Sequence, residues 1–431
     1  MGHAQTEREG GDVAAGDRTR EHIPHGARTV MASQRSAGTR AYHERGLAEI
    51  ALLFLRLGTT AFGGPAAHIS IMEDEVVRRR KWLSREEFLD YLGAANLIPG
   101  PNSTELAIHI GHARGGWPGL IIAGSAFIIP AMVMVGTIAW IYTRYGALPE
   151  VSGVLYGVKP IVIAVILQAL WNLGRTAVKT RSLAVLGALA VVAVGAGVHE
   201  LVVLAAGGLG MALARTAAGR RTKVAGPLAL GAAAAAGGAK LAATTAAGAA
   251  VTAVPFGLWP LFLVFAKIGS VLYGSGYVLL AFLRADLVQR FGWLTEQQLL
   301  DATAVGQVTP GPVFTTATFI GYVLGGPAGA LVATFGIFLP AFVFVALSGP
   351  MVPRMRQSRT AAAVLDGVNV ASLALMAVVS FHLARAALVD VTTAILVVLS
   401  LAALLRFRIN SAWLVAAGGL TGWLVTLAGG H

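Results

Sequence analysis

The sequence lacks cysteine altogether and has few charged side chains. Of its 431 residues none is Cys, and 13% are Asp, Glu, Lys or Arg, against roughly 25% in soluble domains. The absence of thiols excludes disulfides, thiolate metal sites, iron–sulfur clusters and cysteine catalysis. The mean hydropathy of +0.70 means that the chain has more apolar residues than the core of a soluble protein could bury. The sequence therefore predicts a membrane protein.

The sequence also lacks the short motifs of common enzyme classes. It has no zinc-binding spacing, no Walker phosphate loop and no nucleophile elbow. We therefore expect no enzymatic activity, no cofactor and no metal, and we infer that an ion gradient supplies energy. The net charge is +12, and the Lys and Arg residues that produce it lie in the N-terminal tail and in short connectors between apolar segments. That distribution is typical of residues that orient a protein in a bilayer, and it disfavours a nucleic-acid partner.

Apolar segments of about 20 residues, enough to cross a bilayer, recur from residue 48 onward. The first series lies at residues 48–71, 88–112, 117–141, 152–173, 182–198 and 200–215, and the second at 258–282, 299–323, 328–347, 361–384, 388–405 and 411–428. We expect membrane repeats at 46–224 and 255–431. Residues 1–45 are polar and predict a disordered cytoplasmic tail. The Ala/Gly-rich residues 225–254 fit either a linker or a linking membrane helix, which we favour.

The two series are copies of one another. Arg56 corresponds to Lys267 and Trp82 to Trp293, each 211 positions later, and Pro99-Gly100-Pro101 shifts by the same amount onto Pro310-Gly311-Pro312. After a one-residue slip, Pro130 corresponds to Pro340. Chance alignment does not produce this agreement, so the sequence predicts an internal duplication.

Basic residues occupy different connectors in the two copies. They lie at 175–181 and 215–223 in the first copy, but at 354–359 and 406–408 in the second, which align with nearly uncharged loops. Equivalent loops therefore face opposite sides of the membrane, as in an inverted-topology repeat. Residues 225–254 would supply the additional membrane span that this topology requires. The basic connector 72–87 would lie outside if 48–71 and 88–112 both span, so re-entrant hairpins are left open for these two segments.

The Pro-Gly-Pro triplets interrupt apolar segments, because proline removes a backbone donor and blocks the helix. The residues after each triplet suit a new helix start, where free N–H groups attract anions. In an inverted repeat the two breaks converge near the midplane, which predicts a substrate site. A packing kink is the alternative. The candidate residues are Asn96, Pro99, Gly100, Pro101, Asn102, Ser103 and Thr104, with Gln307, Pro310, Gly311, Pro312, Thr315 and Thr316 in the second copy.

A second break occurs in both copies, at Gly63 and Gly64 in the first and at Gly274 and Ser275 in the second. The small residues allow either a close approach of the backbone with local unwinding or close helix packing alone. Two equivalent cations, Arg56 and Lys267, lie within apolar segments, where an unpaired charge is costly. We expect them to balance the charge of an oxyanion, and pairing with a carboxylate or snorkelling to the interface is the alternative.

Ionisable side chains suited to proton coupling lie in the first copy only. Glu105 and His109 share one helix face, and His68 precedes them. None aligns with an ionisable residue in the second copy. Two interpretations stay open: these residues couple proton movement in the first copy alone, or the histidines lie at the membrane interface without that role.

These features together resemble the chromate ion transporter family in its long, two-domain form. The residues that carry the resemblance are Phe62-Gly63-Gly64-Pro65, Arg78-Arg79-Arg80-Lys81-Trp82-Leu83, Pro99-Gly100-Pro101 and their second-half echoes. The resemblance covers nearly everything after residue 47. It implies export of chromate, and of sulfate-like oxyanions, from the cytoplasm, driven by ion gradients and conferring chromate resistance. Gly64-Pro65 becomes Ser275-Gly276, a departure that argues against equal roles for the halves.

The sequence as a whole predicts an all-α, multi-pass plasma-membrane protein with two inverted repeats and discontinuous helices. We expect a secondary-active oxyanion transporter, and a passive anion channel and a non-transporting membrane scaffold are the alternatives. The expected partners are the oxyanion and the lipid bilayer. The coupling ion, for which a proton is the candidate, and a homodimer are left open.

Overall fold

The computed structural model describes residues 46–62, 64–146, 148–219, 255–273, 276, 278–348, 359–407, 409 and 411–428. Every regular element in these ranges is helical, which confirms the predicted all-α class. The predicted tail, the whole linking segment 225–254 and parts of several basic connectors lie outside the described residues. Residues from Leu47 onward form one unit of the fold.

The first repeat consists of short helices followed by long ones. Residues 46–60 are helical, and then come α2 (Gly64–Glu73), the π-helical turn η1 (Asp74–Arg79), α3 (Arg85–Ala95), α4 (Asn102–Tyr145), α5 (Pro149–Ala177), α6 (Arg181–Gly195) and α7 (Glu200–Gly219).

The second repeat follows the same order. It consists of α9 (Leu258–Val271), α10 (Leu279–Leu283), the π-helical turn η2 (Arg284–Arg290), α11 (Glu296–Val308), the 3₁₀ turn η3 (Val313–Thr315), α12 (Thr316–Ser348), α14 (Arg359–Ala387), α15 (Val391–Phe407) and α16 (Ser411–Leu427). The agreement extends to single hydrogen bonds. Leu83 N–H donates to the Val76 carbonyl, as Leu294 N–H does to that of Leu287.

Local sequence explains where the short helices begin. Ser84 and Glu87 form a capping box at the start of α3, and Thr295 and Gln298 form the equivalent box on α11. In each box the hydroxyl and the longer side chain satisfy backbone N–H groups that the first turn leaves without partners. The second repeat therefore keeps the same helix start although the neutral Gln298 stands at the position of the acidic Glu87.

Two of the long helices fold back on themselves at a glycine pair. Gly115 and Gly116 leave the helical conformation within α4, and Gly116 has a φ of 60°. A Cβ on Gly111 would collide with the carbonyl of Gly119 and the side chain of Ala123, so the chain reverses between them. The same contact joins Gly321 to Gly329 in α12. The predicted segments 88–112 and 117–141 thus meet at this turn.

Four helices in the described part of the chain are long and apolar enough to cross a membrane. They are the helical stretches Asn102–Tyr145, Val151–Ala177, Val313–Ser348 and Thr360–Ala387. The helix at 46–60 is about 22 Å long at about 1.5 Å per residue, and the part of α4 before its turn is about 20 Å long. Both are shorter than the roughly 30 Å hydrocarbon core. Each of the segments 48–71 and 88–112 therefore consists of two short helices, and both a discontinuous span and a re-entrant hairpin stay predictions.

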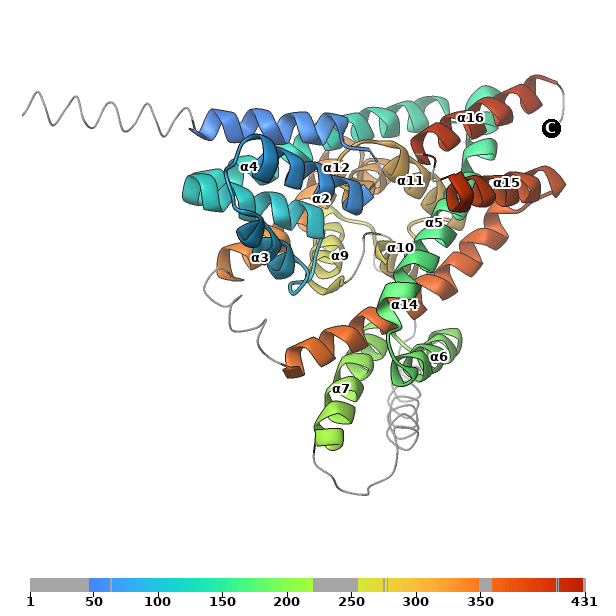
Figure 1. Ribbon diagram of the computed structural model, residues 1–431. Coiled ribbons are helices and arrows are strands. Elements are labelled where there is room, and N and C mark those ends of the chain that lie inside the picture. The colour runs from blue at the N-terminus through green and yellow to red at the C-terminus, as the bar shows by residue number, and fades with distance from the viewer. Residues whose placement is uncertain are drawn as a thin grey trace, which may run out of the picture. The chain divides into compact units, whose positions relative to one another are not determined.

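The two repeats interlock through close helix contacts (Figure 1). Helix α16 of the second repeat lies along α5 of the first, and α7 of the first lies along α14 of the second. A Cβ on Gly157 would collide with the carbonyl of Gly418, and one on the equivalent Gly367 would collide with that of Gly207. Small residues at these contacts let the backbones approach, as membrane helices require.

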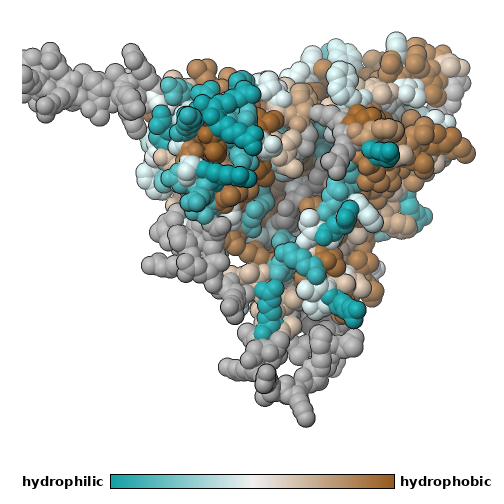
Figure 2. Space-filling view, in the orientation of Figure 1, coloured by the Kyte–Doolittle hydropathy of each residue, from teal (hydrophilic) through white to brown (hydrophobic). Residues whose placement is uncertain are grey.

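Apolar side chains cover the outer surface of the last helices. Figure 2 shows hydrophobic residues gathered over α15 and α16, whereas hydrophilic side chains gather over the first-repeat helices at the left of the view. Val398, Leu399 and Trp413 each expose more than half of their surface. Such a face suits contact with lipid. It agrees with a protein that is integral to the membrane.

Candidate functional site

The two Pro-Gly-Pro breaks exchange hydrogen bonds with the opposite repeats. The Gly100 N–H donates to the Leu272 carbonyl over 2.8 Å, and the Gly311 N–H donates to the Ala61 carbonyl over 3.1 Å. Leu272 and Ala61 are themselves equivalent positions, each just after the first helix of its repeat. Both glycines have positive φ, 137° and 90° respectively, which side chains disfavour. We name this pair of contacts the crossing.

The first copy brings most of its predicted polar residues to the start of α4. The Asn102 side chain donates to Asn96 over 2.6 Å, and the Ser103 hydroxyl lies 3.4 Å from His68. Pro101 is the N-cap residue, and its carbonyl accepts from the N–H groups of Thr104 and Glu105. The first amides of α4 precede these donors and have no acceptor within the helix, as at any helix start.

The second copy is more apolar and its hydroxyls are turned inward. Thr315 donates to the Pro312 carbonyl and Thr316 to the Val313 carbonyl, each over 2.8 Å. Pro310, Gly311 and Pro312 are buried, and Gln307 is half-buried near the end of α11. These hydroxyls satisfy the backbone of their own turn, so the structure offers fewer polar groups to a ligand here than in the first copy.

Several ionisable groups are buried beside the crossing. Within the described residues, the Glu105 carboxylate, the Thr104 hydroxyl and His109 Nε2 have no hydrogen-bond partner. A Cβ on Gly100 would collide with the Glu105 carboxylate, so that carboxylate lies directly against the break. Buried carboxylates without partners are rare because desolvation of a charge is costly. The arrangement can therefore take up a proton or a cation.

His68 and His109 join this cluster to neighbouring segments. His68 Nε2 lies 3.1 Å from the Ala61 carbonyl, the same oxygen that receives the Gly311 N–H. His109 stacks on Tyr91 of α3 with 5.5 Å between the ring centroids. The structure thus brings His68, Glu105 and His109 near the first-copy break.

The two predicted cations are paired with carboxylates at equivalent positions. Arg56 lies 2.6 Å from Glu75, and Lys267 lies 2.5 Å from Asp286. Lys267 also lies 3.7 Å from Glu200. This is the carboxylate pairing that the sequence left open, and charge balance for an oxyanion stays a prediction.

The two carboxylates differ in their electrostatic environment. Burial raises the pKa of Glu75, but hydrogen bonds and charges from Arg56, Arg80 and Arg79 outweigh burial and hold that pKa below its usual value. Burial also raises the pKa of Asp286, and here Lys267 does not offset it, so the net shift is upward.

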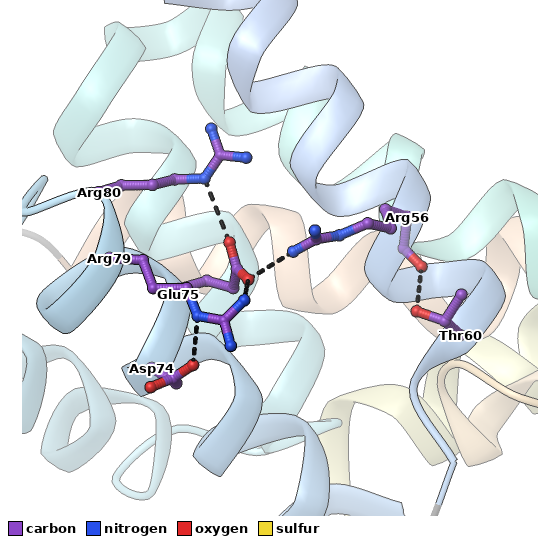
Figure 3. A network of polar contacts seen from close by, with 6 residues as sticks. All are labelled: Arg56, Thr60, Asp74, Glu75, Arg79 and Arg80. Carbon is purple, nitrogen blue, oxygen red and sulfur yellow. Dashed lines mark hydrogen bonds and ion pairs between the residues drawn. The ribbon is translucent and has the colours of Figure 1, made fainter.

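A polar cavity of about 410 Å³ lies beside Arg56. Figure 3 shows Arg56, Arg79 and Arg80 converging on the Glu75 carboxylate, while Arg79 also reaches Asp74 over 2.7 Å. The lining residues are Arg56, Leu57, Thr60, Ser70, Ile71, Asp74, Glu75 and Arg79. Thr60 and Ser70 were missed as candidates, although Thr60 stands one helical turn after Arg56, on the same face.

The predicted second break is described only in part. Gly64 begins α2 with a φ of 75°, whereas Gly63, Gly274 and Ser275 lie outside the described residues.

Comparison with known proteins identifies the family of both repeats. A model of the chromate transporter family matches residues 48–212 and again residues 259–423. The chromate transport protein of Cupriavidus metallidurans is 32% identical over 377 residues, covering 86% of this chain and 91% of that protein. The chromate transport protein of Pseudomonas aeruginosa is 33% identical over 386 residues, with the same coverage. A probable chromate transport protein of Synechococcus elongatus is 30% identical over 351 residues, covering 80% of this chain and 87% of that protein.

No solved structure matches the chain. The duplication, the paired breaks and the two family matches coincide in position, and the resemblance expected from the sequence is confirmed. The chain belongs to the chromate transporter family.

Proposed function

We propose that the chain exports chromate, and sulfate-like oxyanions, from the cytoplasm by secondary active transport and thereby confers chromate resistance. The observation that carries the proposal is the crossing, where each Pro-Gly-Pro break is held by the opposite repeat. Transporters with internal repeats place substrate where discontinuous helices of the two repeats meet. The names of the three relatives supply the substrate class.

The oxyanion binds at the start of α4. The helix dipole and the unpaired first amides attract an anion there, and Ser103 and Thr104 offer hydroxyls in place of its hydration shell. Their second-copy equivalents, Thr315 and Thr316, bond their own turn instead. The two repeats therefore contribute unequally, and the first repeat supplies most of the polar contacts.

A proton is the coupling ion, and Glu105 carries it. An ionised Glu105 beside the start of α4 would repel a dianion, whereas a protonated carboxyl would not. Proton and oxyanion consequently bind together at the crossing, and because a dianion with one proton keeps one net negative charge, the inside-negative membrane potential drives the pair out of the cell. The repeats lie in opposite orientations in the plasma membrane with the N-terminal tail in the cytoplasm, and alternating access exposes the crossing to each side in turn.

The test uses Gly100→Ala and Gly311→Ala, which force a side chain onto positive-φ positions and against Glu105 and Ala131 respectively. Uptake of radiolabelled chromate into inverted vesicles should fall to the level of vesicles without the protein. Gly210→Ala is the matched control, because a Cβ there meets open space. Wild-type uptake in both crossing variants would contradict the proposal.

Ser103→Ala keeps the experiment informative if either glycine variant misfolds. It removes one hydroxyl at the start of α4 without straining the backbone. The chromate concentration that gives half-maximal uptake should rise, and an unchanged value would count against substrate binding at this helix start.

A further inference from the structure

The polar cavity beside Arg56 combines groups that suit a small anion. Arg56 and Arg79 line it with guanidinium groups and Ser70 with a hydroxyl, and Asp74, Glu75 and Thr60 complete its polar wall. The Thr60 hydroxyl already donates to the Arg56 carbonyl, so its oxygen faces the cavity as an acceptor for water. Guanidinium matches the paired oxygens of an oxyanion, and the Ser70 hydroxyl can replace one of its water molecules. The volume of about 410 Å³ leaves room for such an ion together with some of its water.

The second repeat lacks this lining at the equivalent positions. Val271 stands in place of Thr60, Ala281 in place of Ser70 and Ala285 in place of Asp74. The ion pair of Arg56 with Glu75 persists there as Lys267 with Asp286, and Arg290 stands in place of Arg79. The framework is thus common to both repeats, while the hydroxyl lining belongs to the first alone.

The arginines keep donor capacity beyond their present ion pairs. Glu75 receives Arg56 over 2.6 Å, Arg79 over 3.2 Å and Arg80 over 3.3 Å, and Asp74 receives Arg79 over 2.7 Å. The side chains of Arg56 and Arg79 are 51% and 65% exposed, and each guanidinium carries five N–H donors. A second anion can therefore join Arg56 and Arg79 while Arg80 still neutralises Glu75.

The cavity also lies next to the crossing along the chain. Thr60 lines the cavity, and the following residue, Ala61, offers the carbonyl that receives the Gly311 N–H. The Thr60 hydroxyl donates to the Arg56 carbonyl over 2.7 Å, so the last helical turn before the crossing carries both the cation and the hydroxyl (Figure 3).

We propose that this cavity is a loading site for a tetrahedral dianion, occupied before the anion reaches the start of α4. The inference rests on the proposed transport function and adds a second subsite to it. The incoming anion draws Arg56 from Glu75, and Glu75 keeps Arg80 as its counterion. Only the first repeat provides this site, so the anion loads from one entrance.

The experiment is equilibrium binding of chromate, and separately of sulfate, to detergent-purified protein by calorimetry. Arg79→Gln, and a double variant that combines Thr60→Val with Ser70→Ala, should raise the Kd roughly tenfold. The double variant gives the first repeat nearly the lining of the second. Arg290→Gln is the matched control at the equivalent second-repeat position and should leave the Kd unchanged.

Glu75→Gln removes the competing carboxylate and is expected to tighten anion binding, provided that circular dichroism shows intact helices. Unchanged Kd values in the Arg79 and hydroxyl variants would overturn the loading site. So would an equal loss in Arg290→Gln, or no binding by the wild-type protein. Binding that follows the expected pattern without chromate flux in vesicles would instead contradict the proposed transport function and leave the loading site standing.

Discussion

Two carboxylates at the same position of the two repeats show how neighbours decide a residue's chemistry. Glu75 and Asp286 are both buried, and each pairs with a cation on the first helix of its repeat. Glu75 has three arginines around it, and Asp286 has Lys267 close by, Arg290 only at 4.0 Å and the like charge of Glu200 nearby. The first carboxyl is therefore held ionised, and the second is the easier of the two to protonate.

This contrast predicts different titrations. Acidification should protonate Asp286 at a higher pH than Glu75, because the pKa of Asp286 is raised and that of Glu75 is lowered. Infrared spectra of the carboxyl band, compared among wild type, Glu75→Gln and Asp286→Asn, measure both. The reverse order would contradict the electrostatic assignment.

The same reasoning gives the pH dependence of the Glu75 contribution to stability. Because its folded pKa is depressed, that contribution is present above the unfolded pKa of about 4.5 and is lost as pH falls through the folded value. Glu75→Ala should lower stability by about 1–2 kcal/mol at neutral pH, discounted because the arginines are largely exposed. The difference from wild type should shrink in acid when unfolding is followed by circular dichroism.

Glu105 gives a prediction for substrate binding. Its carboxylate lies against Gly100 at the break, so its negative charge should weaken oxyanion binding as pH rises. Glu105→Gln mimics the protonated form, and its affinity for chromate should stay high and independent of pH. His112→Gln, an exposed change on the same helix, should keep the wild-type pH dependence. A Glu105→Gln variant that keeps the wild-type profile would exclude this residue as the proton carrier.

At the scale of helices, glycine contacts hold the repeats together. A Cβ on Gly157 of α5 would meet Gly418 and Gly422 of α16, whereas one on Gly210 of α7 meets open space. Gly157→Ala should therefore lower stability by about 1–3 kcal/mol through overpacking, seen as a lower thermal midpoint in detergent. Gly210→Ala should be neutral or slightly stabilising, since alanine favours helix. Equal midpoints for the two variants would contradict the interlocking contact.

The sequence anticipated most of the elements and the places where they break. Pro-Gly-Pro predicted interruptions because proline cannot continue a helix, and α3 and α4 are separated there, as are α11 and α12. It did not settle whether 48–71 and 88–112 cross the membrane, because hydropathy records apolar length and not chain reversal. The position of the repeat slip was also hidden. The 3₁₀ turn Val313–Thr315 rises more per residue than the first turn of α4. The second copy therefore needs one residue fewer between its Pro-Gly-Pro break and Gly321 than the first copy needs between its break and Gly111.

At the scale of the whole molecule, duplication was readable from residue matches, but interlocking was not. Pairs such as Gly100 with Leu272 and Gly157 with Gly418 join residues far apart in sequence, and no local pattern records them. The pairing of Arg56 with Glu75 was one of several alternatives, since sequence gives positions along a chain and not distances across it. The cavity was missed for the same reason, because Thr60, Ser70 and Arg79 come from three helical segments.

The duplicated framework and the unequal polar residues together support the proposal that the first repeat binds the substrate and the second repeat supports it. Both repeats supply the crossing, which Gly100 and Gly311 hold from opposite sides. At the start of α4 the first repeat supplies buried polar groups without a hydrogen-bond partner at Thr104, Glu105 and His109, whereas Thr315 and Thr316 of the second repeat bond their own turn. The central claim is that this arrangement couples oxyanion movement to a proton gradient.

The most direct measurement is chromate accumulation by purified protein in proteoliposomes, with and without an imposed pH gradient. The account predicts that radiolabelled chromate accumulates above its equilibrium level when the outside is the more acidic side, because proton and anion enter together, and that a protonophore abolishes the accumulation. Flux that only equilibrates chromate whatever the gradient would contradict it and indicate a passive channel. Absence of any oxyanion flux would contradict transport altogether.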